Sequence, residues 1–185
     1  MKIENKTKTV LNISILIVEE GNSEDNSVVR LTQKKMDELN LYKAETVFLK
    51  GQKETLAFVM PDDSGLLADN KIRMNHVLRR NIGLSNEVSI SKPPNVPIGK
   101  RVDIRPFADT IKGYTGNLTH TYLIPYFKDT FRPIHKGDTF LVNGIRSRTL
   151  EFKVIKTDPE NYCIVGDQTV IFIGEPIPED KFYTT

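Results

Sequence analysis

The segment LYKAETVFLKG, residues Leu41 to Gly51, has a near copy later in the chain, IHKGDTFLVNG, residues Ile134 to Gly144. Aligned without a gap, both read apolar, any residue, Lys, small, acidic, Thr, three apolar residues, any residue and Gly. In each copy the Lys-small-acidic triplet predicts a tight turn, and the Thr with its apolar followers predicts the start of a buried strand. A strand-entry turn used repeatedly indicates small β-barrels, in which closure removes exposed edges. The alternative is that such turns recur by chance, because turn chemistry limits the residue choice.

Strand-like segments continue outward from both copies, so the sequence predicts a mainly β fold with short helices. Most are short, rich in β-branched and aromatic residues, and bounded by turn residues. The strands are expected at residues 14–18, 27–31, 45–51, 55–60 and 87–91 in the first half, and at 101–107, 139–144, 148–157, 162–166 and 169–174 in the second.

Two helices and one less regular stretch interrupt these strands. Thr32 can cap the first helix through its side chain, and Gly83 can end the second. Residues 117–131 do not alternate cleanly and predict short helical turns broken at Pro125. The predicted helices cover 32–41 and 74–83, the second with an apolar stripe of Met74, Val77 and Leu78.

A proline-rich segment divides the chain into two parts. Pro93, Pro94 and Pro97 cannot lie inside a helix or a central strand, so this segment is expected to be a boundary. The polar, proline-containing end of the chain is expected to start a further linker. The predicted division is a first subdomain over 15–94, a linker over 95–99, a second subdomain over 100–175, and the start of a linker over 176–185.

Composition bounds the function classes. The formal net charge is +2, which argues against a dedicated nucleic-acid binder, because such domains are strongly basic. Cys163 is the single cysteine, so no intramolecular disulfide can form. The longest apolar stretch near the amino terminus, Val10 to Val18, is too short to span a bilayer, and no membrane insertion is expected.

Motifs for catalysis and metal binding are not found. There is no phosphate-binding Gly-x-x-x-x-Gly-Lys-Ser/Thr loop and no Gly-x-Gly-x-x-Gly, so no catalytic residue is predicted. The three histidines, His76, His120 and His135, are far apart, which predicts no metal site and solvated side chains at His76 and His135. Cys163 lies among apolar residues and is expected in the core. The adjacent carboxylates, Glu24-Asp25 and Asp62-Asp63, are expected to be solvated turn residues. The basic residues from Lys71 to Arg80 form either a solvated face or a dock for an acidic protein surface.

Five segments resemble the amino-terminal domain of valosin-containing protein, in the family of cell-division-cycle AAA ATPases. They are Glu24–Gly51, Lys71–Asn81, Thr115–Phe127, Arg132–Val142 and Glu151–Val165, in order and at compatible spacing. The resemblance implies a double-psi β-barrel followed by a smaller β-barrel. It also implies a non-enzymatic region that recruits adaptors and substrates to a homohexameric unfoldase of ubiquitylated proteins, including those of endoplasmic-reticulum-associated degradation. ATP and magnesium would bind only in ATPase domains that follow this region, which itself holds no cofactor and is expected to be monomeric alone.

In that family, adaptors dock in a groove between the two barrels. The implied partners are ubiquitin-regulatory-X domains, other ubiquitin-like folds, and adaptors of the ubiquitin-fusion-degradation and nuclear-protein-localisation types. By motif position, the first barrel supplies Asp25, Val28, Tyr42, Lys43, Glu45, Phe58 and Met60, the second side supplies Ile98, Thr130, Phe131, Arg132 and Phe172, and the residues facing the ATPase domain are His76, Asn143 and Arg148. For Val28, Phe58 and Met60, a simple core position is the alternative.

The sequence departs from the family pattern in the groove. The usual aromatic-Arg-Gly-Asp turn is YKAE here, and Lys43 lacks the planar fork of arginine while Ala44 cannot adopt positive φ as freely as glycine. Phe131 and Ile98 replace tyrosines, Phe172 replaces a histidine, and Asn143 replaces an arginine. We expect an altered set of adaptors and a cytoplasmic location, with nuclear, ER-associated and, for a divergent paralogue, plastid-type compartments left open. The alternative functions are a stand-alone β-barrel enzyme and a nucleic-acid-binding barrel.

Overall fold

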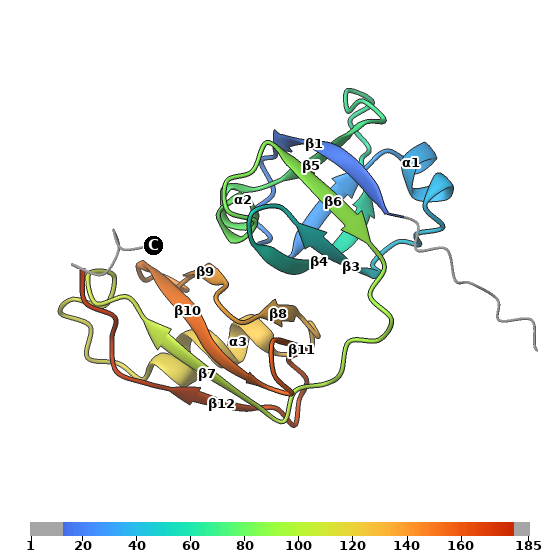
Figure 1. Ribbon diagram of the computed structural model, residues 1–185. Coiled ribbons are helices and arrows are strands. Elements are labelled where there is room, and N and C mark those ends of the chain that lie inside the picture. The colour runs from blue at the N-terminus through green and yellow to red at the C-terminus, as the bar shows by residue number, and fades with distance from the viewer. Residues whose placement is uncertain (1–12, 180–185) are drawn as a thin grey trace, which may run out of the picture.

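The first unit of the molecule is a closed β-barrel. The computed structural model describes residues 13–179, and Figure 1 shows them as two β-rich units joined by an extended segment after β6. In the first unit the hydrogen-bonded order is β1-β5-β2-β4-β3-β6, with the pairs β1/β5 and β2/β4 parallel. The strands are β1 (Ser14–Glu20), β2 (Val28–Leu31), β3 (Thr46–Lys50), β4 (Glu54–Pro61), β5 (Lys71–Met74) and β6 (Glu87–Ser91).

Period-two burial builds the core of this barrel. In β2, β3 and β5 every second side chain is buried, which is the pattern expected where one face of a strand points into a barrel. The helices α1 (Gln33–Glu38) and α2 (His76–Asn81) follow β2 and β5 and add Met36 and Leu78 to the same core. No helix within residues 13–179 is long and apolar enough to cross a membrane.

The second unit contains two sheets around an aromatic core. One sheet has the order β12-β7-β10-β9 and the other pairs β11 with β8. Tyr122, Phe127, Phe140 and Phe152 make ring contacts inside this core. The mainly β class with short helices is confirmed. The elements are β7 (Arg101–Pro106), the π-helical turn η1 (Thr119–Leu123), α3 (Ile124–Phe127), β8 (Pro133–His135), β9 (Thr139–Asn143), β10 (Thr149–Asp158), β11 (Tyr162–Ile164) and β12 (Val170–Ile173).

The caps of the two helices define where they start. The Thr32 side chain accepts a hydrogen bond from the Lys35 N–H, so the predicted cap is confirmed. The predicted start of the second helix at Met74 is wrong, because Met74 ends β5 and the side chain of Asn75 caps α2 by accepting from the Leu78 N–H. The strand β5 was missed because its apolar residues continue directly into the helical stripe.

Pro125 does not break the helical stretch. It lies in the first turn of α3, where its missing N–H is not needed for an intrahelical bond. The predicted break is therefore wrong, and the chain instead changes from η1 to α3 at this point. The short strand β8 was also missed, since Pro133 opens it and offers no ladder donor. The part of the predicted final linker beyond Glu179 lies outside the described residues.

The two sequence copies form matching turns. In the first, the backbone N–H of Ala44 donates to the carbonyl of Val59 on β4 at 2.8 Å. In the second, the N–H of Gly137 donates to the carbonyl of Val154 on β10, also at 2.8 Å. Each turn leads into a strand, β3 or β9, that pairs antiparallel with the strand receiving that bond.

The acidic residue of each copy closes its turn. The Tyr42 N–H donates to Glu45 Oε2, and the His135 N–H donates to Asp138 Oδ2, both at 2.9 Å. The small residue between them has a left-handed backbone, with φ of 66° at Ala44 and 91° at Gly137. The repeated pattern therefore encodes one turn geometry twice, and only the second copy has the residue that adopts it without strain.

Replacing Ala44 with glycine should stabilise the protein. The left-handed conformation costs a non-glycine residue about 1–2 kcal/mol. Glycine also gives the unfolded chain more conformational entropy, which lowers stability by about 0.5–1 kcal/mol. The net gain in stability is therefore about 0.5–1 kcal/mol. Urea unfolding of Ala44→Gly, followed by circular dichroism, measures it.

The matched control is Gly137→Ala. A Cβ at residue 137 would meet no heavy atom within 4 Å, so the loss should come from the backbone alone, and after the same entropy offset it should be about 0.5–1 kcal/mol. If both substitutions changed the free energy of unfolding in the same direction, the account of the twin turns would be wrong.

Candidate functional site

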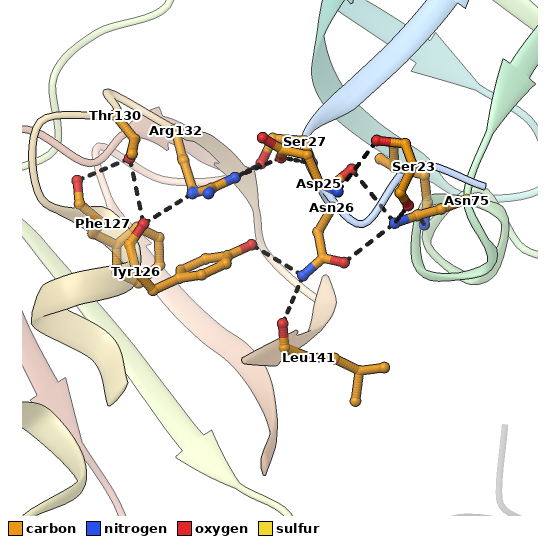
Figure 2. A network of polar contacts seen from close by, with 11 residues as sticks. Ser23, Asp25, Asn26, Ser27, Asn75, Tyr126, Phe127, Thr130, Arg132 and Leu141 are labelled. Carbon is orange, nitrogen blue, oxygen red and sulfur yellow. Dashed lines mark hydrogen bonds and ion pairs between the residues drawn. The ribbon is translucent and has the colours of Figure 1, made fainter. Parts of the chain in front are cut away.

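Arg132 connects the two units. Its Nη1 donates to Asp25 Oδ1 at 2.7 Å and to Ser27 Oγ at 3.0 Å, both on the loop before β2. Its Nε donates to the carbonyl of Tyr126 at 2.9 Å, and the guanidinium stacks over the Tyr126 ring at 4.2 Å (Figure 2). Charge, hydrogen bonds and ring stacking thus hold one side chain against both units.

Asn26 extends this contact. Its side-chain amide donates to the carbonyl of Leu141 on β9 at 2.7 Å and to the Tyr126 hydroxyl at 3.3 Å. On the other side, Asn75 donates to Asn26 Oδ1 and to the carbonyls of Ser23 and Asp25 (Figure 2). The loop 23–27 is therefore fixed from both directions, which keeps the groove wall in one position.

The helix α2 and strand β9 contribute a second set of contacts between the units. Asn81 exchanges hydrogen bonds with the backbone of Thr139, at 2.9 and 2.8 Å. Arg80 forms an ion pair with Glu151 at 2.5 Å, and Val77 packs into the core of the second unit. Polar and apolar contacts together make this a continuous interface.

Asp138 is buried in the same interface. Its Oδ1 accepts a hydrogen bond from Thr55 Oγ1 on β4 at 2.8 Å, while Oδ2 closes the second turn. Burial raises the pKa of this carboxyl to about 7, against the opposing effect of the hydrogen bonds from His135 and Thr55. The corresponding Glu45 is only half-buried. Although burial raises its pKa, the hydrogen bond from the Tyr42 N–H and the ammonium of Lys92 lower it below the usual value.

An apolar groove opens beside this interface. Its cavity of about 390 Å³ has an apolar floor of Val28, Phe58 and Met60, which are half-buried and outside the closed core of the barrel. Phe131, 47% exposed and at φ 49°, forms the opposite side. The lining residues that the sequence named are Asp25, Val28, Phe58, Met60, Thr130 and Phe131, and those it did not name are Ser23, Arg30 and Ala44.

The first turn forms the rim of the groove. Tyr42 and Lys43 are exposed on either side of the bend that brings Ala44 to the cavity. Lys92 from the segment after β6 pairs with Glu45 at 2.9 Å and lies over the Tyr42 ring. The rim therefore places the Tyr42 ring and the exposed Lys43 beside the apolar floor.

Six residues expected in the groove do not line this cavity, namely Tyr42, Lys43, Glu45, Ile98, Arg132 and Phe172. Ile98 is near Phe131, because a Cβ at Gly166 would come within 4 Å of both side chains. Phe172 projects from β12 and is covered by the Arg101 guanidinium at 4.6 Å. Ile98 therefore adjoins the groove at Phe131, whereas Phe172 belongs to the sheet of the second unit.

The residues predicted to face an ATPase domain are all exposed. His76 opens α2, and Asn143 at the end of β9 accepts a hydrogen bond from the Thr149 hydroxyl at 2.7 Å. Arg148 donates to the carbonyl of Lys112. The role of this set stays a prediction.

Several sequence predictions about single side chains are corrected. His135 is not solvated, since its ring stacks on Tyr162 and its Nε2 lies 3.9 Å from Glu54 of β4. Asp62 is not a free turn residue, because Arg73 holds it at 2.9 Å with its side chain 5% exposed. Both predictions failed for the same reason, because residues distant in sequence pack against His135 and Asp62. The core position of Cys163 is confirmed, and burial raises the pKa of its thiol to about 11.

Two sequence models of one family match the chain. The model described as Cell division protein 48, N-terminal domain, matches residues 15–93, and the model described as Cell division protein 48, domain 2, matches residues 113–180. The chain belongs to the cell division protein 48 family. The resemblance seen in the sequence is thereby confirmed. The first match covers the closed barrel of the family and the second covers most of the following unit, so both walls of the groove lie in family-defined domains.

Membership identifies the general role of this region. The matched domains are the amino-terminal, adaptor-binding part of a family of AAA ATPases, and they are not its catalytic part. Within residues 13–179 no group of three His, Cys, Asp or Glu side chains is placed to hold a metal.

The buried Asp138 predicts a stability that falls as pH rises. In the unfolded chain its pKa is about 3.9, whereas in the folded protein it is about 7. Between these values the folded state binds more protons, so stability declines through this window, by about 1.4 kcal/mol for each pKa unit. Asp138→Asn should reduce the difference in unfolding free energy between about pH 5 and about pH 8.

The exposed Asp63 provides the control. Urea unfolding of Asp63→Asn should show the same pH dependence as the unmodified protein. An unchanged pH dependence in Asp138→Asn would show that this carboxyl is ionised in the fold.

Proposed function

We propose that this chain recruits adaptors and substrates to a hexameric AAA ATPase by binding ubiquitin-like adaptor domains and short peptide motifs in the groove between its two units. The observation that carries the proposal is the groove itself. It combines an apolar floor with an aromatic side chain, Phe131, and a charged rim, which is the anatomy of a protein-binding surface.

The rigidity of the walls supports this proposal. A preformed groove loses little conformational entropy on binding, because its side chains are already ordered. Here Arg132, Asn26 and Asn81 connect the walls through direct hydrogen bonds. Adaptor segments would therefore meet a fixed surface.

The remaining parts of the proposal concern the longer protein. ATP and magnesium would bind in ATPase domains outside this chain, the parent would form a homohexamer, and this region alone would be monomeric without a cofactor. The partners would be ubiquitin-regulatory-X domains and adaptors of the ubiquitin-fusion-degradation and nuclear-protein-localisation types, in the cytoplasm or at nuclear, ER-associated or plastid-type sites.

The basic helix region offers little support for nucleic-acid binding. Arg73, Arg79 and Arg80 each form an ion pair, with Asp62, Glu20 and Glu151 respectively. Cations neutralised in this way release few counterions on binding to phosphates, so the affinity they could add is small.

Calorimetric titration with a ubiquitin-regulatory-X domain tests the proposed function. We expect binding that Phe131→Ala weakens about tenfold or more, as for a central aromatic anchor. Lys43→Ala, at the rim, should weaken it less and should lower its dependence on salt.

Matched variants make this result specific. Lys136→Ala removes the equivalent lysine of the second turn, and Ile15→Ala truncates an exposed isoleucine on β1 outside the groove. Neither should change the affinity. Binding that is insensitive to Phe131→Ala, or no binding by a folded protein, would contradict the assignment of this partner to the groove.

A further inference from the structure

We propose that Arg30 forms a carboxylate-binding subsite in the groove, so that the bound segment is a mostly neutral peptide with one Asp or Glu beside its apolar anchor. This inference rests on the proposed function, since it takes the groove as the docking site. It adds the chemistry of the segment that the groove selects, through a residue that the sequence motifs did not mark.

Strand register places Arg30 at the end of the apolar floor. In the parallel pair β2/β4, Val28 lies opposite Phe58 and Arg30 lies opposite Met60. All four side chains are half-buried and point away from the barrel core. The floor is therefore apolar at one end and cationic at the other.

The charge of Arg30 is not compensated within the described residues. No described carboxylate lies within 4 Å of its guanidinium, whereas Arg132 pairs with Asp25 and Arg73 pairs with both Asp62 and Glu19. On the neighbouring strand β5, Arg73 is the direct strand partner of Arg30, and its charge is already matched by these two carboxylates. Among residues 13–179, Arg30 therefore keeps an unpaired positive charge on this face of the barrel, and an incoming carboxylate can pair with it.

The guanidinium is held in position. Its Nη1 donates to the carbonyl of Pro61 at 2.9 Å, which fixes the plane of the side chain. Its other N–H groups have no protein acceptor among residues 13–179. A planar fork with free donors matches the two oxygens of a carboxylate.

A second cavity continues the groove beyond Arg30. This cavity of about 470 Å³ shares Ser23, Val28 and Arg30 with the apolar groove, so Arg30 stands at their common border. An extended peptide with its apolar residue over Phe58 would pass Arg30 on its way into the second cavity. The next side chains of the peptide would then contact Arg30, which would pair with a carboxylate among them.

The surroundings select a single carboxylate over a polyanion. Glu20, Asp62 and Asp63 line the second cavity and would repel a phosphate backbone or a run of acidic residues. Glu20 and Asp62 are paired with Arg79 and Arg73, whereas Asp63 forms no ion pair within the described residues, so a carboxylate is favoured only directly beside Arg30. An isolated Asp or Glu in a mostly neutral peptide fits this balance.

A phage-displayed library of random peptides, selected on the whole 185-residue protein, tests the subsite. Counter-selection on Phe131→Ala keeps only peptides that use the groove. We expect the retained peptides to carry one Asp or Glu next to an aromatic or aliphatic residue. Synthetic copies should bind about tenfold more weakly to Arg30→Gln, as expected for loss of a charge-assisted pair.

A double-mutant cycle separates direct pairing from indirect effects. Changing the peptide acid to its amide should weaken binding to the unmodified protein by the same factor and should not affect binding to Arg30→Gln. The exposed Arg146, changed to Gln, is the control for loss of one positive charge and should leave the affinity unchanged.

Other outcomes would overturn the inference in distinct ways. If the groove-binding peptides showed no preference for Asp or Glu, or bound Arg30→Gln as tightly as the unmodified protein, the carboxylate subsite would be refuted. The proposed function would not be affected by that result. Tighter binding of a phosphoserine copy than of the Asp copy would reassign it to phosphopeptides. If no selected peptide depended on Phe131, the groove would fail as a peptide-docking site and the subsite would fail with it.

Discussion

The contact of Arg132 with Asp25 and Tyr126 is the interaction on which the groove depends. The Arg132 side chain is 15% exposed, and its guanidinium has a carboxylate, a hydroxyl, a carbonyl and an aromatic ring around it. A charge this far removed from water is stable only while its partners stay in place. Because those partners belong to both units, the same requirement fixes the position of one barrel against the other. Phe131 is the adjacent residue, so its exposed ring is oriented by the same anchor.

The twin turns show how one local geometry acquires two uses. Both close with an acidic side chain on a backbone N–H, and both lead into a strand that pairs antiparallel with the strand accepting the turn's backbone hydrogen bond. In the second turn Asp138 is buried against β4, where it accepts a hydrogen bond from the Thr55 hydroxyl and becomes part of the interface. The first turn faces solvent, where Glu45 pairs with Lys92 and Ala44 borders the groove. The turn pattern thus specifies how each strand begins. The tertiary surroundings decide whether the turn helps to hold the two units together or forms part of the binding surface.

Local sequence patterns predicted the parts of the fold that depend on local interactions. Short runs rich in β-branched and aromatic residues marked β2, β3 and β10, and Thr32 marked a helix start, since strand preference and capping act within a few residues. The strand β5 escaped detection because Ile72 and Met74 continue without a break into the helix stripe, so two periods overlap. His135 and Asp62 were misjudged because their partners, Tyr162, Glu54 and Arg73, approach through tertiary packing.

The groove could be predicted only through resemblance, and this explains why Arg30 was missed. Asp25 and Arg132 lie in segments that resemble a family and Phe131 directly precedes one, and the resemblance gave each of them a role, whereas Arg30 lies in the first segment without an assigned role. Arg30 alternates with the buried Val29 and Leu31 exactly as a solvated strand residue would, and nothing local separates the two cases.

What distinguishes Arg30 is its surroundings. Its strand neighbours are Met60, which is apolar, and Arg73, whose charge is already satisfied by Asp62 and Glu19. A cation on a rigid strand, next to an apolar floor and opposite a neutralised arginine, has little reorganisation left to undergo when a carboxylate arrives. Preorganisation of this kind favours selectivity, because the cost of positioning the charge is borne by the fold before the partner binds.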